Sequence, residues 1–353
     1  MNAFSPLAEF RIRAADAVAD AAAIEKFLAA HVDATPFHRP AWSAAVARGC
    51  RQTGHFLIAQ QGSAVTGVLP LTEVRSRVFG RALVSTGFGV GGGILATDGA
   101  SAAGLADAAW ALAQRLGCDS AELRGGWLPP DWQLREGLYA GFTRALPAGE
   151  EAILQAIPRK QRAEVRRALG MGLELRIGRS AADLAHHYRV YSESVRNLGT
   201  PVFPRTLFAA MLEEWGEDAD ILTVAKDGKP VASVLSLYFK DCVYPYWGGG
   251  TFQARQLRAN ELMYFALMRH AAARGCDRFD FGRSKLGTGA YAFKKNWGFA
   301  PEPLVYASRT RDGAPPRSIN PLDPKYRLKV AAWRKLPLWL ANRVGPPIAR
   351  GLG

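Results

Sequence analysis

The residues best suited to chemistry lie between Phe279 and Phe299, in the run FDFGRSKLGTGAYAFKKNWGF. An aromatic stretch is followed there by a glycine-rich turn and by two adjacent lysines, Lys294 and Lys295. A fixed lysine ammonium can contact a phosphate, and it can stabilise the negative charge that develops on a carbonyl oxygen during acyl transfer. Successive residues of a helix point about 100° apart, so one of the two lysines is expected to face away from any site.

The glycines of this run also suggest a nucleotide-binding loop. The segment GRSKLGTG, which begins at Gly282, has two glycines at the spacing of a P-loop, but Thr-Gly follows where a P-loop has Lys-Ser or Lys-Thr. We therefore predict no P-loop. Arg283 and Lys285 remain candidates for a phosphate contact, and a plain polar turn is an equally good interpretation.

A second group of cations lies in the segment IPRKQRAEVRRALG, where Pro158 and Gly170 are typical of the first turn and the end of a helix. Arg159, Arg162 and Arg166 share one face of such a helix. Arginine forks match phosphate oxygens. This face could bind a pyrophosphate-linked acceptor or the backbone of a tRNA, or it could simply be solvated.

Other reactive side chains show no pattern of a metal site or a serine nucleophile. His186 and His187 are adjacent, but no histidine spacing such as HExxH is present, so we expect no metal. Ser233 and Ser236 lie on a predicted strand without a His and Asp pattern near them, so we expect no serine triad. The four cysteines are far apart and form no CxxC, which favours reduced thiols.

Length and composition indicate a folded protein that is strongly basic. The chain has 353 residues, 48% of them hydrophobic, which is enough for two domains of ordinary size. Its net charge is +14, from 45 basic and 31 acidic residues. Such a charge favours nucleic acid, a phosphorylated carrier or an anionic membrane face as partner, or it reflects an arginine-rich composition alone. We expect no DNA partner.

The N-terminal segment MNAFSPLAEFRIRAADAV lacks the basic start and apolar core of a signal peptide. No apolar run approaches the ~20 residues that a membrane-spanning helix needs. We therefore expect a soluble, cytoplasmic protein that is at most peripheral at the inner face of the inner membrane.

Two stretches of the chain repeat the same order of landmarks. HFLIAQQGSAVTGVLPL and DILTVAKDGKPVASVLSL each predict two strands joined by a tight turn, at Gln61-Gly62 and Asp227-Gly228. Each is followed by a glycine cluster, a helical pattern that stops at Gly-Cys-Asp, and a short strand. Four landmarks in the same order predict an internal duplication of one α/β unit.

The duplication predicts two domains and a tail. We place the first domain at residues 1–150, the second at 151–306 and a basic C-terminal tail at 307–353. In the first copy the last strand, SAELRGGW, is followed by Leu-Pro-Pro instead of a Phe-Lys-Lys helix. We therefore expect a degenerate first domain and one active site, in the second domain.

The C-terminal tail combines cations with aromatic and aliphatic residues. Between residues 324 and 353 it has seven lysines and arginines and no acidic residue, with Trp333 and Trp339 among several leucines. Such a segment can lie on an anionic membrane surface or pack back over the domains. Pro337 and the Gly-Pro-Pro at 345–347 limit any long helix.

The order of strand, turn, strand, glycine cluster, helix and strand resembles the GNAT acyltransferase core. In that fold two central strands separate, and the carrier of the acyl donor lies near the N-terminus of the following helix, where free N–H groups and the helix dipole favour a phosphate. The resemblance implies a mixed-sheet α/β fold with two tandem GNAT-like domains, and acyl-CoA as one donor. The equivalent segments here, FQARQLRANELMY and ATDGASAAGLADA, depart from the usual pattern of Gln or Arg, two residues, Gly, one residue, and Gly or Ala.

Four motifs resemble those of the FemAB family. They are the Phe-Asp-Phe-Gly run at 279–282, Phe-Lys-Lys at 293–295, Trp-Gly-Phe at 297–299, and Tyr-Pro-Tyr at 244–246 with the glycines after it. The resemblance covers roughly residues 37–306. It is nearest to the FemAB-like proteins associated with the exosortase (PEP-CTERM) protein-sorting and exopolysaccharide systems of Gram-negative bacteria.

The FemAB resemblance implies transfer of an amino acid from aminoacyl-tRNA to an amine on a lipid- or nucleotide-linked muropeptide. The acceptor would be a lipid- or nucleotide-linked peptide or glycan, tRNA a possible partner, and no cofactor tightly bound. Lys294 would be catalytic. The residues expected to bind substrate are Arg159, Arg162, Tyr191, Arg196, Tyr246, Trp247, Lys285, Phe293 and Lys295. The alternatives are an acyl-CoA-dependent acetyltransferase of exopolysaccharide and a non-catalytic carrier-binding assembly protein.

Overall fold

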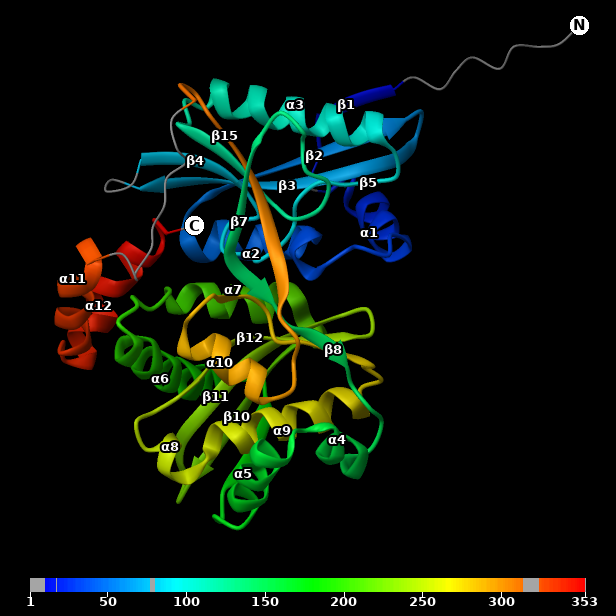
Figure 1. Ribbon diagram of the computed structural model, residues 1–353. Coiled ribbons are helices and arrows are strands. Elements are labelled where there is room, and N and C mark those ends of the chain that lie inside the picture. The colour runs from blue at the N-terminus through cyan, green and yellow to red at the C-terminus, as the bar shows by residue number, and fades with distance from the viewer. Residues whose placement is uncertain (1–9, 17, 77–79, 314–323, 353) are drawn as a thin grey trace, which may run out of the picture. The chain divides into compact units, whose positions relative to one another are not determined.

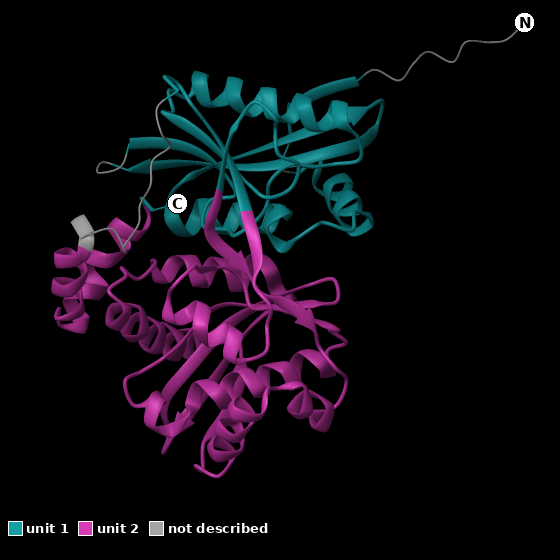
Figure 2. Ribbon diagram, viewed as in Figure 1, with its two compact units in different colours: residues 1–135, 305–317, 351–353 teal, residues 136–304, 318–350 magenta. Residues whose placement is uncertain are grey.

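The computed structural model describes residues 10–16, 18–76, 80–313 and 324–352. The chain forms two compact units, which are coloured separately in Figure 2. Unit 1 comprises Met1–Arg135, Val305–Arg317 and Gly351–Gly353, and unit 2 comprises Glu136–Leu304 and Ser318–Arg350. Strands β7 (Gln133–Gly141) and β15 (Glu302–Thr310) each belong partly to both units.

Unit 1 is a mixed sheet with helices packed on it (Figure 1). Its strands are β1 (Phe10–Ala14), β2 (Thr53–Gln61), β3 (Ala64–Ser76), β4 (Gly80–Ser85), β5 (Leu95–Ala96) and β6 (Ser120–Arg124). Its helices are α1 (Ala21–Ala30), the 3-10 turn η1 (Pro36–His38), α2 (Pro40–Cys50) and α3 (Gly99–Arg115). Neighbours in the sheet follow the order β1-β2-β3-β4-β6-β15, in which β4 and β6 pair in parallel and the other neighbours are antiparallel.

Helix α3 forms because its apolar residues recur at helical spacing. Leu105, Ala109 and Leu112 lie on its buried face and join the core of unit 1 with Leu69 and Leu83 of the sheet. Asp98 begins the helix as its N-cap, and its carboxylate accepts the Ser101 backbone N–H.

Unit 2 repeats this plan. Its strands are β8 (Thr143–Ala145), β9 (Glu174–Gly178), β10 (Ala219–Lys226), β11 (Lys229–Phe239), β12 (Cys242–Gly250), β13 (Arg278–Asp280) and β14 (Ser284–Lys285). Its helices are α4 (Glu150–Ala156), α5 (Arg159–Leu169), α6 (Ala181–Leu198), α7 (Arg205–Trp215), η2 (Gly216–Asp218), α8 (Ala254–Leu257), α9 (Ala259–Ala273), α10 (Gly289–Asn296), α11 (Pro324–Arg334) and α12 (Leu338–Ala349). The main sheet has the order β8-β13-β12-β11-β10-β9, and β14 pairs with β7.

Helices α6 and α9 cover opposite faces of this sheet. Successive residues of a strand point to opposite sides. A Cβ on Gly248 of β12 would meet Tyr264 of α9, whereas a Cβ on Gly249 would meet Ser194 of α6. The strands between these helices supply fully buried residues such as Val234 to the core of unit 2.

The predicted α/β class with mixed sheets and an internal repeat is confirmed. The order β2-β3-β4-α3-β6 in unit 1 recurs as β10-β11-β12-α9-β13 in unit 2. Asp227 and Gly228, with φ of 50° and 70°, make the tight turn predicted between β10 and β11. Of the helices in the described part of the chain, none has both the length and the apolar character of a membrane span.

Candidate functional site in unit 2

Strands β12 and β13 separate at the centre of unit 2. They pair in parallel at two positions only, Cys242 with Arg278 and Val243 with Phe279. Beyond them β12 continues along β11 to Gly250, whereas the chain after β13 turns away. A gap between two parallel neighbours exposes backbone groups and makes room for a ligand at the ends of the strands. This is the place where the FDFG run lies.

The equivalent position in unit 1 is closed by its own glycine loop. There β4 pairs with β6 as far as Ser85, the last residue of β4. The loop that follows returns to β6, because Gly93 donates its N–H to the carbonyl of Arg124 at 3.1 Å and Trp127 donates to Ile94 at 2.9 Å. In unit 1, backbone pairing therefore continues along β6 beyond the end of β4, whereas in unit 2 the pairing of β12 with β13 stops after two positions.

Lys294 projects from α10 toward the end of β13. Its Nζ donates to the carbonyl oxygens of Gly282 at 3.1 Å and Arg283 at 3.0 Å. The ammonium also lies 5.4 Å from the ring centre of Phe142 and 5.7 Å from that of Phe281, within the range of a cation–π contact. An ammonium has three N–H donors, so these two carbonyls leave one for a further acceptor.

Burial gives Lys294 an unusual acidity. Loss of solvation lowers the pKa of its ammonium to about 7, against the partly opposing field of Asp280. Asp280 is held by the Gly282 backbone N–H at 2.7 Å, and burial raises the pKa of its carboxyl. Perturbed titratable groups of this kind are enriched at functional sites. Near neutral pH, Lys294 can therefore exist in either protonation state.

An aromatic cluster supports this lysine. The rings of Tyr264, Phe281, Phe293 and Trp297 pack on one another, and the Tyr264 and Phe281 centres are 4.7 Å apart in an edge-on arrangement. Thr288 begins α10 and accepts the Tyr291 N–H, which fixes the start of the helix and so the direction of Lys294. Phe293, predicted to bind substrate, is a half-buried member of the cluster.

The glycines at the end of β12 serve close packing of side chains. A Cβ on Gly249 would lie 2.3 Å from Ser194 Oγ, and one on Gly250 would lie 2.7 Å from Asn260 Oδ1. The space above these glycines is therefore occupied by side chains of α6 and α9. A side chain at either position would therefore clash with these helices, although the glycines themselves are half-exposed.

The N-terminus of α9, where the GNAT resemblance places the diphosphate of acyl-CoA, holds acidic residues. Glu261 lies in the first turn, contacts its own backbone N–H and the side chain of Gln161, and has a pKa that burial raises. Glu164 of α5 pairs with Arg258, the N-cap of α9, at 2.5 Å. Carboxylates already satisfy the positive end of this helix dipole. These residues do not fit a diphosphate at this position.

Two predicted arginines lie on α5, beside α9. Arg162 donates to the carbonyl oxygens of Ile157 and Gln155, so its guanidinium caps the C-terminal end of α4. Arg159 is exposed, and within the described residues no hydrogen bond or ion pair involves its side chain. The structure thus leaves Arg159, of the two, open to an anionic ligand.

Three predicted aromatic residues lie on the other side of β12, towards α6 and α7. Tyr191 is buried and stacks on His187 with ring centres 5.6 Å apart, and Trp247 packs edge-on against Phe208 at 5.3 Å. Tyr246 is half-buried and packs edge-on against Trp247 at 4.6 Å. This places Tyr191 and Trp247 in the core of unit 2.

Sequence patterns did not reveal that His187 meets Ser233. Its Nδ1 lies 3.1 Å from Ser233 Oγ, which also contacts Thr223 Oγ1 at 3.2 Å. Both residues are fully buried, and burial lowers the pKa of His187 to about 3. A neutral histidine without access to solvent, in contact with the hydroxyl of Ser233, stabilises the core and cannot act on a substrate from there.

The remaining predicted cations lie at three places in unit 2. Arg196 donates to the carbonyl oxygens of Arg334 and Leu336, at the end of α11. Lys285 lies over the ring of Tyr139 at 5.9 Å. Lys295 is exposed and lies 5.9 Å from the ring of Tyr291.

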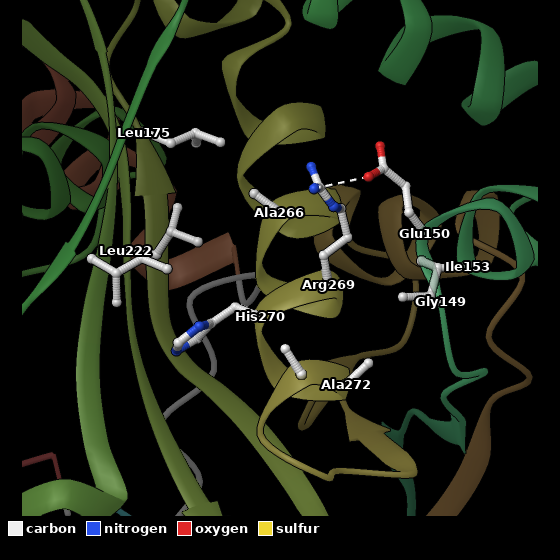
Figure 3. Close-up of a pocket in the computed structure, with 11 residues that line it drawn as sticks. Gly149, Glu150, Ile153, Leu175, Leu222, Ala266, Arg269, His270 and Ala272 are labelled. Atoms are coloured by element: carbon white, nitrogen blue, oxygen red, sulfur yellow. Dashed lines mark ion pairs between the residues drawn. The ribbon is translucent and has the colours of Figure 1, made fainter.

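A separate pocket of about 520 Å³ lies between α9 and strands β9 and β10 (Figure 3). His270 forms part of its wall, and the Arg269–Glu150 ion pair at 2.8 Å lies at its side. Buried Asp220 orients His270 through a 2.8 Å contact and also accepts the hydroxyl of Tyr238. No residue predicted from the sequence lines this pocket. In the part of the chain that the structure describes, no group of three or more His, Cys, Asp or Glu side chains could hold a metal.

The β12–β13 separation and the helix α9 that connects these two strands are arranged as in the GNAT fold. Residues 158–295 match the family described as Acetyltransferase (GNAT) domain, a segment that includes both separating strands and Lys294. No curated protein matches the sequence. GNAT domains in general take their acyl group from acyl-CoA.

Three solved structures share the fold along most of their length. FemX aligns with a TM-score of 0.64 and 12% identity, over 84% of this chain and 96% of its own. A tandem GNAT protein from the clavulanic acid biosynthesis pathway aligns at 0.56 and 14%, over 88% of this chain and 100% of its own. The C-terminal domain of a putative lysylphosphatidylglycerol synthetase from Agrobacterium fabrum aligns at 0.55 and 13%, over 84% and 94%. These likenesses confirm the predicted tandem GNAT-like fold.

Proposed function

We propose that the protein transfers an aminoacyl or acyl group to an amine or hydroxyl of a cell-envelope peptide or glycan precursor. The observation that carries this proposal is the position of Lys294, held beside the point where β12 and β13 separate, with one N–H donor left. The FDFG, FKK and WGF motifs, which resemble those of FemAB transferases, surround this lysine.

In the proposed reaction, the acceptor's lone pair attacks the donor's carbonyl carbon. The bond between that carbon and the carrier then breaks, and the acceptor's proton leaves with the carrier. The third N–H of Lys294 stabilises the negative charge that forms on the carbonyl oxygen. Two backbone carbonyls fix the ammonium, so it does not need to reorganise as that charge develops.

For the donor, the structure favours aminoacyl-tRNA over acyl-CoA. The acidic residues Glu261 and Glu164 at the start of α9 do not fit the diphosphate of CoA. Exposed Arg159 and the net charge of +14 suit a polyanionic carrier. One neighbour in fold bears the name of a lysylphosphatidylglycerol synthetase, and so of an enzyme whose product is an aminoacylated lipid.

The proposed link to the exosortase (PEP-CTERM) system depends on the sequence resemblance over roughly residues 37–306 alone. It would place the acceptor among exopolysaccharide or envelope precursors at the inner membrane. Acylation of exopolysaccharide from acyl-CoA is the second candidate, supported by the match of residues 158–295 to a GNAT domain.

A transfer assay with labelled donors tests the proposal. The purified chain is incubated with nucleotide- and lipid-linked envelope precursors and with either labelled aminoacyl-tRNA or labelled acetyl-CoA. We expect label in the precursor fraction from aminoacyl-tRNA, and competition by uncharged tRNA but not by CoA. Label from acetyl-CoA alone, with competition by CoA, would support the second candidate. No transfer from any donor, with intact fold, would contradict both.

A further inference from the structure

Helices α11 and α12 turn large apolar side chains outward. Trp339 on α12 is 70% exposed and Leu328 on α11 is 84% exposed, while Val344 and Ile348 are also exposed. At 100° per residue, Trp339, Arg343, Val344 and Ile348 occupy one half of α12. The exposed half of this helix therefore includes three of its bulky residues, Trp339, Val344 and Ile348.

The inward half of α12 has half-buried Leu338 and three small residues. Ala341, Gly345 and Ala349 recur every four residues and are buried against unit 2. Gly345 is close enough to Val202 that a Cβ there would lie 3.1 Å from its backbone nitrogen. This pattern reverses that of an ordinary surface helix, which buries its large apolar residues.

Hydrogen bonds fix the two helices in this orientation on α6, beside which they lie in Figure 1. Arg196 of α6 donates to two carbonyls at the end of α11, and Arg334 donates back to Leu198 at 3.3 Å. Asn342 of α12 donates to Ser192 at 3.3 Å. The exposed face is thus set by specific contacts on the opposite side of each helix.

The charge of the same surface has one sign. Residues 324–353 contain seven lysines and arginines and no acidic residue. Lys335, in the turn after α11, and Arg343 of α12 are exposed, as are the apolar side chains of Leu328 and Trp339. Apolar side chains that project among cations fit the interface of an anionic lipid bilayer, where cations meet headgroups and aromatic rings enter the headgroup region.

We propose that the outward face of α11 and α12, formed by Leu328, Lys335, Trp339, Arg343, Val344 and Ile348, binds an anionic membrane surface. A second copy of the chain is a poorer occupant, because two faces with only positive charge repel each other. The proposal goes beyond the transferase reaction, since it depends on these helices alone and holds whatever the acceptor is.

Vesicle co-sedimentation of the full chain tests the proposal. Wild-type protein is expected to bind vesicles of phosphatidylcholine with 30% phosphatidylglycerol, and to bind pure phosphatidylcholine much more weakly. The double variant Lys335→Gln/Arg343→Gln is expected to lower the partition coefficient about 25-fold, from roughly fivefold per cation. Trp339→Ser/Ile348→Ser is expected to lower it by at least tenfold, because less apolar surface enters the interface.

Matched variants separate this face from the overall charge of the protein. Lys26→Gln/Lys229→Gln removes two exposed cations elsewhere, and Val32→Ser removes an exposed apolar residue elsewhere. Both are expected to bind like wild type. Equal weakening by these controls, or no binding of the wild type to anionic vesicles, would overturn the proposal. So would a wild-type oligomer without lipid that Trp339→Ser/Ile348→Ser converts to monomer. Because no donor or acceptor is present, loss of transferase activity in another assay does not affect the result.

Discussion

The pH dependence of transfer is expected to change when Lys294 is replaced by arginine. Burial lowers the pKa of the Lys294 ammonium to about 7. About half of the molecules then have a charged lysine at pH 7 and about a tenth at pH 8. If the charged form stabilises the oxyanion, the rate falls about fivefold over that interval and about tenfold per pH unit beyond it.

Arginine keeps its charge throughout this range. The ratio of the Lys294→Arg rate to the wild-type rate should therefore rise about fivefold from pH 7 to pH 8 and continue to rise. The titration of the acceptor amine changes both rates by the same factor, because the acceptor is the same for both proteins, and this factor cancels in the ratio. Single-turnover transfer at saturating acceptor, measured between pH 6 and pH 9, gives both rates.

Lys294→Met removes the donor with little change in side-chain volume. It is expected to lower the rate by about 10²–10³-fold, the usual effect of losing one donor to an oxyanion. Lys229→Met, at an exposed lysine outside the site, serves as the control and is expected to keep the wild-type rate. A flat rate ratio, or a wild-type rate that rises through pH 7 relative to Lys294→Arg, would refute the role of the ammonium and indicate a general base.

Three further predictions concern stability, each measured by denaturant unfolding. Burial raises the pKa of the Glu261 carboxyl in the folded protein, so the free energy of unfolding falls as the pH rises above 4.5. Glu261→Gln should therefore be more stable than wild type at pH 7 and equally stable at pH 3. An equal or lower stability of Glu261→Gln at pH 7 would contradict the burial of the Glu261 carboxylate. Arg162→Met should lose about 1–3 kcal/mol with its hydrogen bonds to the end of α4, whereas a similar loss in exposed Arg159→Met would show that the capping contacts are unimportant. Phe142→Ala, at a fully buried position beneath Lys294, should lose about 3–5 kcal/mol, and a loss below about 1 kcal/mol would show that this ring is not part of the core.

The repeat of hairpin, helix and strand could be predicted because each landmark depends on local sequence. Asp227-Gly228 specifies its own turn, and helix α9 ends just before the Gly-Cys-Asp at which the helical pattern of the sequence stops. The pairing of β15 with β6 could not be predicted in this way, because its partners, such as Tyr306 and Arg124, lie far apart in the sequence. Only the tertiary fold brings such strands together.

For the site, local motifs indicated where chemistry lies but not what each side chain contacts. The run from Phe279 to Phe299 identified Lys294, yet its bonds to the carbonyls of Gly282 and Arg283 follow from a turn whose path the sequence does not show. Arg196 was expected to bind substrate because of the FemAB resemblance. Its partners lie about 140 residues further along the chain, on a tail with no family pattern. For Glu261 the sequence has one signal of its contact with the helix N-terminus, which is an acidic residue in the first turn of a predicted helix.

Mass spectrometry of envelope peptides and glycans tests the transferase assignment most directly. Extracts are compared from a strain that lacks the gene and from strains that express wild type, Lys294→Met or Lys229→Met at equal protein levels. We predict one mass difference that is absent without the gene and with Lys294→Met, and present with wild type and with Lys229→Met. Restoration of that mass by Lys294→Met would contradict a catalytic role for the site, and an unchanged spectrum without the gene would contradict transfer to the envelope.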